Sequence, residues 1–220
     1  MTIVKMSASR CVLIGDFVAS RRAPDRRALH RTVEAALARV GEGVPAVTEL
    51  RIVVGDEFQG AFATLGDAVD AALLVRLELL PDADVRVGIG RGPVELLDAE
   101  RGIEDGPGWW AARAAVEAVE EVAARAATRH ARTAYRSTPE PPGVDPAEPA
   151  VNAALLCRDH LVGSLSHRSL RLLRGLMDPH TTQSQLAQRE GISASAVSQR
   201  VRTDGIGAVL AAHELLRSLP

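Results

Sequence analysis

The chain has 220 residues, 46% hydrophobic and 25% charged, which suffices for one domain of ordinary size with a small appendage. Its formal net charge of -2 excludes a global field that attracts nucleic acid or anionic membrane, so such binding needs a local patch. Neither Cys11 nor Cys157 belongs to a zinc or redox motif, and no run of about 18 apolar residues predicts a membrane span. We expect a cytoplasmic protein without a membrane partner.

The N-terminal half of the chain alternates strand-like and helix-like patterns. A buried apolar run at residues 11–14 predicts a strand that ends at Asp16. Apolar residues at helical spacing then predict a covering helix that opens at Asp25. Alternating apolar residues predict a hairpin whose strands lie at 50–54 and 58–62.

Four further elements follow before the sequence changes character. Apolar periodicity predicts a helix at 67–80 and a glycine-rich strand from residue 85 to 92. A long helix rich in Ala, Val and Glu is expected at 109–132, and a last strand at 133–137. The order β-α-β-β-α-β-α-β predicts an α/β (α+β) sandwich.

A proline-rich stretch divides the chain. Five prolines between residues 138 and 149 stand among acidic and small residues, a composition that favours extended linkers. We therefore expect a first domain at 1–137, a linker at 138–150 and a second domain at 151–220. Strand-like patterns are absent from the second domain, which is expected to be all α.

Two carboxylates are candidate metal ligands: Asp16, where the first strand ends, and Asp56, at the tip of the hairpin. Mg²⁺ (or Mn²⁺) is commonly bound by one or two carboxylates together with water and substrate phosphate, so these residues suggest that the chain handles a nucleoside triphosphate or other nucleotide. The expected nucleotide contacts are Phe17, Val18, Ser20, Arg21, Gly88 and Gly90. The alternative is that Asp16 caps a turn and that Asp56 and Glu57 are solvated hairpin residues.

Three blocks, at 12–16, 54–58 and 86–90, occur in an order that resembles the palm-like catalytic domain of class III nucleotide cyclases and GGDEF diguanylate cyclases. The resemblance covers roughly residues 10–137 and implies a ferredoxin-like, palm cyclase-type sandwich. It also implies that, in an active enzyme, the catalytic residues would be Asp16, Asp56, Glu57 and Arg113.

Arg113 matches an arginine with which class III cyclases stabilise the transition state, whereas Trp109 occupies the position of their asparagine. The motifs at 15–21, 55–59 and 105–113 are most similar to the SatD family of bacterial proteins. That resemblance implies a cyclase-like fold that has kept its acidic pair and changed its transition-state groups. It favours nucleotide binding over synthesis.

Trp109 and Trp110 are conspicuous in a chain with only 3% aromatic residues. One reading is packing of a helix N-terminus against the sheet, because large aromatic side chains are usually buried. The other is stacking on a nucleotide base. Successive helical residues point about 100° apart, so at most one tryptophan can face the site, and we expect it to be Trp109.

The second domain contains a pattern typical of a helix-turn-helix. Residues 182–187 begin one helix, Gly191 supplies the turn, and residues 193–202 form a second helix. In the major groove of DNA, the expected contacts are Ser193, Ser195, Ala196, Gln199, Arg200 and Arg202. The alternative is a helical hairpin that binds another protein.

These features lead to a functional expectation. The chain is expected to be a transcriptional regulator that binds DNA through the helix-turn-helix, as a homodimer on paired half-sites, and binds a nucleotide with Mg²⁺ through the first domain. The alternative is a metal-dependent nucleotide cyclase or another enzyme that converts nucleoside triphosphates. A scaffold without enzymatic activity is the third possibility.

Overall fold

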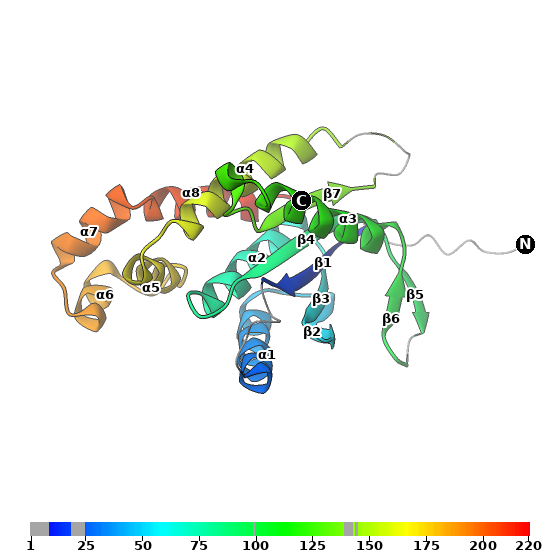
Figure 1. Cartoon of the computed structure of the whole chain (residues 1–220), viewed down its shortest axis with the longest axis horizontal. Coiled ribbons are helices and arrows are strands. Elements are labelled where there is room, and N and C mark those ends of the chain that lie inside the picture. Colours follow the sequence, from blue (N-terminus) through cyan, green and yellow to red (C-terminus); the bar gives the residue numbers. More distant parts are fainter. Residues whose placement is uncertain (1–8, 19–24, 99, 139–142, 144) are drawn as a thin grey trace, which may run out of the picture.

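The computed structural model describes residues 9–18, 25–98, 100–138, 143 and 145–220, without the side chain of Val54. Its centre is a five-stranded sheet of order β2-β3-β1-β4-β7 (Figure 1). The pairs β2–β3, β3–β1 and β1–β4 are antiparallel, and β7 is parallel to β4. Their bounds are β1 Ser9–Phe17, β2 Thr48–Val54, β3 Glu57–Phe62, β4 Val85–Pro93 and β7 Thr133–Ser137.

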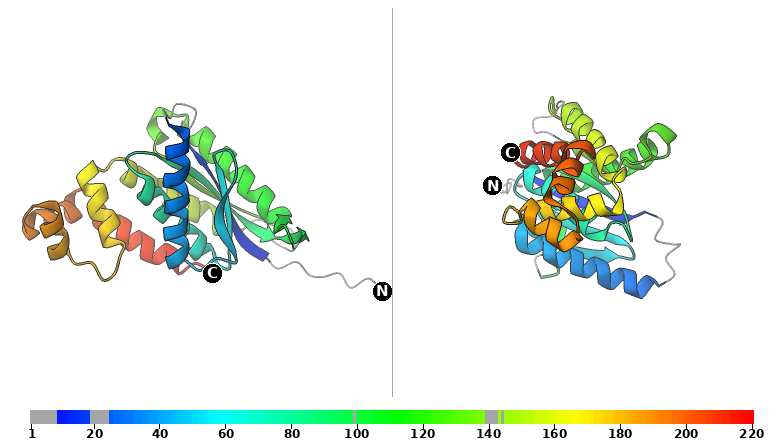
Figure 2. Two further views of the ribbon diagram at one scale, coloured as in Figure 1. Left: turned by 90° about the horizontal axis from the view of Figure 1, so that it is seen from below. Right: turned by 90° about the vertical axis from the view of Figure 1, so that its left-hand side faces the viewer.

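Helices cover both faces of this sheet, as the left view in Figure 2 shows. Helices α1 (Arg26–Gly43) and α2 (Leu65–Leu79) pack on the face to which Cys11, Leu13 and Phe17 of β1 point. Helix α3 (Pro107–Ala123) packs on the other face, which receives Val12 and Ile14. Alternate residues of β1 thus serve two cores, as expected for a strand buried on both sides. The predicted α/β sandwich and its order of elements are confirmed.

Two details of the first domain differ from the sequence prediction. An additional hairpin, β5 (Glu95–Asp98) with β6 (Ile103–Asp105), precedes α3 and forms a separate two-stranded sheet. Helix α3 ends at Ala123 rather than near residue 132 and is followed by a short 3-10 helix, Ala126–Thr128. The hydroxyl of Thr128 donates to the Val122 carbonyl at 2.6 Å, which satisfies one carbonyl at the end of the helix and favours termination there.

The C-terminal part is all α. Its helices are α4 Glu148–Gly163, α5 His167–Leu176, α6 Gln183–Glu190, α7 Ala194–Thr203 and α8 Ile206–Arg217. Helices α5 to α8 surround a core that includes Leu172, Leu173, Val197 and Val209. Thr182 caps α6 with a capping box and Gly191 ends it in the left-handed conformation, at φ 62°. The turn between α6 and α7 thus has the conformation that the sequence predicts.

The C-terminal helices pack directly on the first domain. Leu73 and Leu77 of α2 belong to the core surrounded by α5 to α8, while Leu155 of α4 and Leu216 of α8 belong to the core beneath the sheet. Helix α4 begins at Glu148, inside the stretch that the sequence predicted as linker. Pro149 is tolerated in its first turn, because backbone amides there need no partner within the helix. Among the described residues, no helix is long and apolar enough to span a membrane.

Helix α4 also covers the edge of the sheet that β7 forms. Side chains on one side of α4 accept hydrogen bonds from three outward-facing amides of β7: Thr133 bonds to Asp159 at 2.6 Å, Tyr135 to Asn152 at 2.9 Å and Ser137 to Glu148 at 3.0 Å. The Asn152 amide also donates to the Tyr135 carbonyl at 2.8 Å. The helix thereby occupies the backbone groups with which another strand could pair.

Candidate functional site

The acidic residues singled out in the sequence lie at one end of the sheet. Asp16, near the end of β1, lies directly opposite Glu57, the first residue of β3, in the antiparallel register. Asp56 immediately precedes Glu57 in the turn, next to Gly55, whose φ of 62° favours glycine. Opposite residues of an antiparallel pair share one face, so Asp16 and Glu57 both lie on the α3 side.

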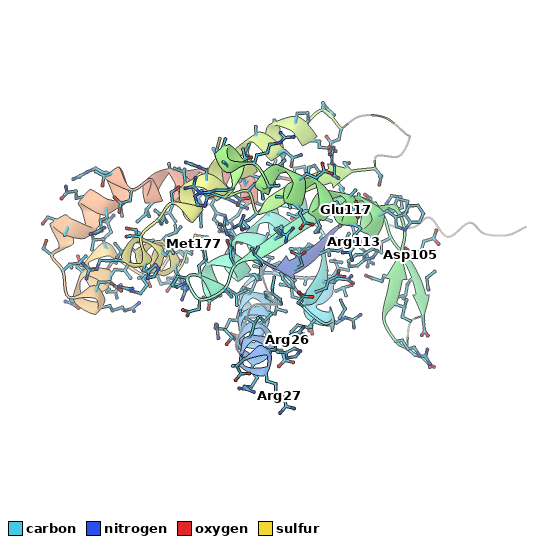
Figure 3. All side chains as sticks on the ribbon, in the orientation of Figure 1. Arg26, Arg27, Asp105, Arg113, Glu117 and Met177 are labelled. Atoms are coloured by element: carbon cyan, nitrogen blue, oxygen red, sulfur yellow. The ribbon has the colours of Figure 1, made fainter. Side chains whose placement is uncertain are left out.

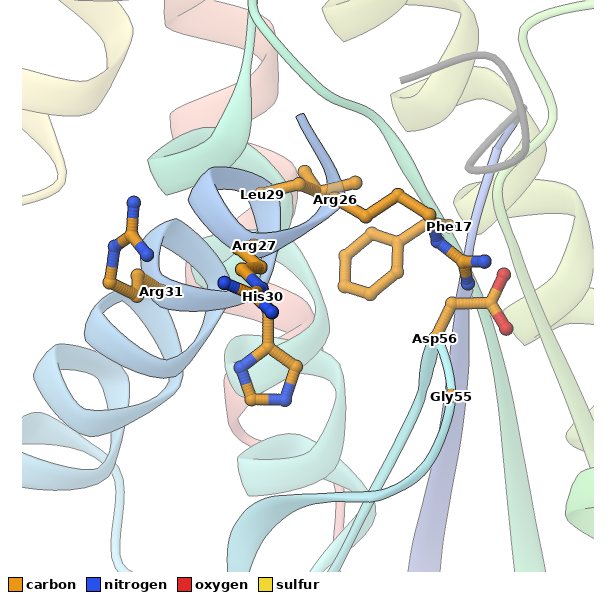
Figure 4. Close-up of a pocket in the computed structure, with 8 residues that line it drawn as sticks. All are labelled: Phe17, Arg26, Arg27, Leu29, His30, Arg31, Gly55 and Asp56. Atoms are coloured by element: carbon orange, nitrogen blue, oxygen red, sulfur yellow. The ribbon is translucent and has the colours of Figure 1, made fainter. Parts of the chain in front are cut away.

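A cavity of about 390 Å³ lies between the same turn and the first turns of α1. Its walls include Phe17 at the end of β1 and Gly55 with Asp56 at the tip of the hairpin. The opposite wall is basic, and in Figure 4 the side chain of Arg26 extends towards Asp56. The basic residues that line the cavity are Arg26, Arg27, His30 and Arg31. The cavity therefore combines a carboxylate with several positive groups.

The surroundings of Asp16 disfavour the charged form of its carboxyl group. Burial raises the pKa of this carboxyl above its usual range, and the neighbouring carboxylates Glu120, Asp56 and Glu57 raise it further, while Arg86 opposes them. The Oδ1 atom is buried and has no hydrogen-bond partner among the described residues. A half-buried carboxylate near three other carboxylates, with one oxygen that accepts no hydrogen bond, is a site where a cation would be stabilised.

The donor set fits a two-carboxylate Mg²⁺ site more closely than a multi-ligand metal centre. No group of three or more His, Cys, Asp or Glu side chains in the described part of the chain is arranged to hold a metal. Mg²⁺ needs only one or two carboxylates when water and phosphate supply the remaining oxygens. Asp16 and Asp56 could hold it, and the ion would supply positive charge to neutralise and orient a phosphate chain.

Two of the expected catalytic residues bind each other. One guanidinium nitrogen of Arg113 on α3 lies 2.8 Å from Oε1 and 2.7 Å from Oε2 of Glu57. The amide of Gln59 also donates to Glu57 Oε1, at 2.8 Å. In this arrangement, Arg113 neutralises Glu57 of its own chain. Arg113 must leave this carboxylate before it can stabilise charge on a ligand.

A groove of about 420 Å³ runs along the α3 side of the sheet, where Figure 3 places Arg113 and Glu117 on α3. Trp109 and Glu104 line this groove and also a small adjoining cavity of about 30 Å³. Trp109 Nε1 and Glu104 Oε2 are buried without hydrogen-bond partners in the described structure. Trp109 packs against Val12 and its neighbours, as one of the two readings predicts, and it also borders this groove. Stacking of Trp109 on a nucleotide base stays a prediction. Trp110 is 62% exposed and donates to Asp105.

Part of the expected nucleotide contacts is used for other purposes. A β-carbon at Gly88 would lie 2.3 Å from the Ala112 carbonyl oxygen, and one at Gly90 would lie 2.1 Å from that of Gly108. The close approach at these glycines is therefore that of helix α3, and not that of a ligand as the sequence suggested. The Val18 amide likewise donates to the Asp84 carbonyl at 2.9 Å and is not free to bind phosphate.

Of the other expected contacts, Phe17 lines the cavity, whereas Ser20 and Arg21 lie outside the described residues. The residues that the sequence reading missed are Arg26, Arg27, His30 and Arg31 at the cavity, Glu104 in the groove, and Arg86 with Glu120 beside Asp16. The cluster of basic residues directly after the helix cap at Asp25 was a usable signal. The partners of Asp16 were not, because they depend on the pairing of β1 with β4 and on the position of α3.

The α6–α7 helix pair exposes some of the residues that were expected to contact DNA. Ser195, Gln199 and Arg202 are exposed on α7. Ser193 is also exposed, but its hydroxyl caps the helix by accepting from the Ala196 amide at 3.1 Å. Ala196 itself is half-buried.

Arg200 is paired with groups of its own chain: its Nη1 lies 3.3 Å from Asp204 Oδ2 and 3.4 Å from Ser169 Oγ. Between residues 164 and 205 the chain has six arginines against three acidic residues, a local basic excess in a chain of net charge -2.

Replacement of Asp16 by asparagine is expected to stabilise the protein in the absence of metal. Because the pKa of the Asp16 carboxyl is raised in the folded state, the folded protein binds its proton more tightly than the unfolded chain does. The free energy of unfolding therefore falls as pH rises from the usual pKa of an aspartate through the raised one. Thermal unfolding should show that Asp16→Asn melts at a higher temperature than the wild type at pH 7. The difference should shrink in acid, and equal melting temperatures at every pH would contradict this account.

Comparison with protein families shows that the model described as the SatD family matches residues 11–219. Comparison with curated proteins gives no match. Among solved structures, a bacterial light-regulated adenylyl cyclase is 14% identical, with a TM-score of 0.47 over 59% of this chain and 42% of the other. The present chain therefore spans less than half of that protein.

A second structure of a bacterial light-regulated adenylyl cyclase is 13% identical, with a TM-score of 0.41 over 58% of this chain and 74% of the other. A regulator of polyketide synthase expression from Bifidobacterium adolescentis is 13% identical, with a TM-score of 0.28 over 98% and 83%. These structural likenesses are too slight to indicate function, so the residues of the chain itself must do so.

Proposed function

This chain belongs to the SatD family, and we propose that it is a transcriptional regulator that binds a nucleotide with Mg²⁺ in its α/β domain and DNA through its helix-turn-helix. The observation that carries the proposal is the cavity beside the end of β1, which is lined by Asp56 together with three arginines and a histidine. A site that is both basic and acidic suits an anionic ligand that arrives with a divalent cation.

The two halves of the ligand would meet different groups. Phosphate oxygens would be bound by the arginines of α1, and Asp16 with Asp56 would hold the metal. The groove on the α3 side offers Trp109 and the unpartnered oxygen of Glu104 to the remainder of the ligand. Aromatic faces stack on nucleobases of every kind, so Trp109 would not by itself select among them.

The cavity assignment is tested by charge removal. Arg26→Gln combined with Arg27→Gln should weaken binding of fluorescent nucleoside triphosphates with Mg²⁺ at least about tenfold, since each charge-assisted hydrogen bond contributes about 1.5–3 kcal/mol. Arg125→Gln, which removes one exposed arginine beyond the end of α3, is the matched control and should bind like the wild type. If all three proteins bind the nucleotide with equal affinity, the nucleotide does not bind in this cavity.

The proposed route between the two sites is helix α2. Its residues Ala68, Val69 and Ala72 pack beneath the sheet, while Leu73 and Leu77 belong to the core of the helix-turn-helix. A ligand changes DNA affinity only if it binds two arrangements of the protein with different affinity. A shift of α2 against the sheet would reach α5 and α7 without an intervening flexible segment.

DNA binding is tested on the exposed part of α7. Arg202→Gln should weaken binding to a mixed-sequence duplex and lower the slope of log affinity against log salt by about one, as expected for the loss of one phosphate contact. Arg200→Gln should have a smaller effect, because Arg200 is paired with Asp204. If Arg202→Gln leaves both affinity and salt dependence unchanged, α7 is not the DNA-contacting helix, and a protein-binding role for the hairpin becomes the better explanation. A homodimer remains part of the proposal, and sedimentation tests it.

A second candidate function is a metal-dependent conversion of nucleoside triphosphates. The observation that favours it is the position of Arg113, whose guanidinium reaches the carboxylate of Glu57 at the acidic end of the sheet. Incubation with each nucleoside triphosphate and Mg²⁺ or Mn²⁺, with Asp56→Ala as control, tests this function. Turnover that Asp56→Ala abolishes would favour the enzyme, and absence of turnover in every case would exclude it.

A further inference from the structure

The two carboxylates on the α3 side, Asp16 and Glu57, each face an arginine, but the two ion pairs differ in quality. Glu57 receives Arg113 on both of its oxygens. Asp16 Oδ1 lies 3.4 Å from Nε of Arg86, beyond the distance of a good hydrogen bond. Both of these atoms are buried and have no hydrogen-bond partner in the described structure. The charge of Asp16 is thus only partly compensated by Arg86.

Arg86 is shared with a second carboxylate. Its Nη1 lies 2.5 Å from Oε1 of Glu120 on α3, a much closer contact than the one with Asp16. The Arg86 side chain is 15% exposed, whereas that of Glu120 is 63% exposed. Arg86 and Asp16 are opposite residues of β4 and β1, so the backbone register keeps them adjacent. The guanidinium therefore lies between an inner carboxylate at the end of the sheet and an outer one at the surface.

We propose that Arg86 is an internal competitor for the metal at Asp16, and that Glu120 sets the affinity for metal by drawing the guanidinium away from Asp16. This inference rests on the proposed function, in which Asp16 is a metal ligand. Without metal, Arg86 offsets part of the buried charge. A divalent cation at Asp16 is repelled by that guanidinium, and the repulsion is smallest when Arg86 is fully held by Glu120.

The test is Mn²⁺ binding without nucleotide, measured by electron paramagnetic resonance of the free ion. Arg86→Gln should tighten Mn²⁺ binding on the order of tenfold, because it removes a nearby positive charge. Glu120→Gln should weaken binding by a similar factor, because Arg86 can then turn fully towards Asp16. Glu121→Gln removes the same charge from the adjacent exposed residue of α3 and should leave the affinity within about twofold of the wild type.

The double variant Arg86→Gln/Glu120→Gln shows whether Glu120 acts through Arg86 or attracts the metal directly by its own charge. If Glu120 acts through Arg86, Glu120→Gln should have almost no effect in the Arg86→Gln background. If Glu120→Gln weakens Mn²⁺ binding equally in both backgrounds, Glu120 acts through its own charge and the competitor role is overturned. Far-ultraviolet circular dichroism would check that each variant is folded.

Asp16→Asn distinguishes failure of this inference from failure of the proposed site. Mn²⁺ binding that survives Asp16→Asn unchanged would overturn the metal site itself. A second outcome is that Asp16→Asn loses Mn²⁺ binding while Arg86→Gln and Glu120→Gln bind Mn²⁺ like the wild type. This outcome would support the metal site at Asp16 and overturn only the competitor role of Arg86. Absence of Mn²⁺ binding in both the wild type and Arg86→Gln would overturn both.

Discussion

Gly90→Ala is expected to destabilise the protein by about 3 kcal/mol or more, at the upper end for overpacking of a well-packed core. A β-carbon at residue 90 would lie 2.1 Å from the Gly108 carbonyl oxygen and 2.2 Å from the Ala112 amide nitrogen. Both atoms belong to the backbone of α3, so no side-chain rotation relieves the contact. Chemical denaturation measures the effect, and purified Gly90→Ala should have a clearly lower midpoint in urea.

The control for this substitution is Gly41→Ala on α1, where an added β-carbon meets no atom within 4 Å. Alanine is preferred to glycine within a helix by roughly 0.5–1 kcal/mol, so Gly41→Ala should be neutral or stabilising. A Gly90→Ala protein as stable as the wild type would mean that α3 does not pack on β4 as closely as the structure places it.

Asp159→Ala should be similarly damaging, with a loss of about 3–5 kcal/mol in the free energy of unfolding. Asp159 is fully buried. It accepts hydrogen bonds from the Arg132 amide at 2.7 Å and the Thr133 amide at 2.6 Å, and it pairs with Arg76 at 3.1 Å. Among the described residues, its removal leaves the buried Arg76 paired with Asp84 alone, and it also leaves the amides of Arg132 and Thr133 without this acceptor. The melting temperature should fall by roughly 10 °C.

Asp82→Ala removes an exposed aspartate near the end of α2 and should change the melting temperature little. A double-variant cycle identifies the cause of the loss: Arg76→Met should cost less in the Asp159→Ala background than alone, because the unpaired buried charge has then been removed. If the losses of the two single variants simply add in the double variant, the ion pair with Arg76 does not explain how Asp159 stabilises the protein.

Local patterns were sufficient to predict the main sheet and its first two helices. The apolar run at 11–14 and the alternation at 50–54 predict β1 and β2, and their turn signals place Asp16 and Asp56 at the ends of strands. The order of elements then implies that the two carboxylates lie near each other. The β1–β3 register pairs Asp16 with Glu57, so Asp16 and the turn that holds Asp56 lie at the same end of the sheet.

Tertiary contacts decided the features that the sequence did not indicate. The β5–β6 hairpin is short and contains a register shift, and it is joined to the rest of the protein by long-range contacts such as Glu104 with Arg10 and Thr48. The glycines of β4 look like ligand contacts in the sequence, because the pattern does not reveal that α3 occupies their face.

The electrostatic partners of Asp16 and the docking of α4 and α8 also depend on three-dimensional packing. Arg86 is 70 positions from Asp16 in the chain, and only the β1–β4 register brings them together. Similarly, the three acceptors with which α4 covers β7 are spread over 12 residues of an ordinary-looking helix. No short sequence motif predicts either arrangement.

Calorimetric titration of the whole chain with ATP, GTP, CTP and UTP tests the central claim most directly, with each nucleotide measured in Mg²⁺ and again in excess EDTA. We predict saturable binding of at least one nucleotide in Mg²⁺, and at least about tenfold weaker binding in EDTA and in the double variant Asp16→Asn/Asp56→Asn. Binding of no nucleotide, or affinity that neither EDTA nor the double variant changes, would contradict a metal-dependent nucleotide site at the acidic end of the sheet.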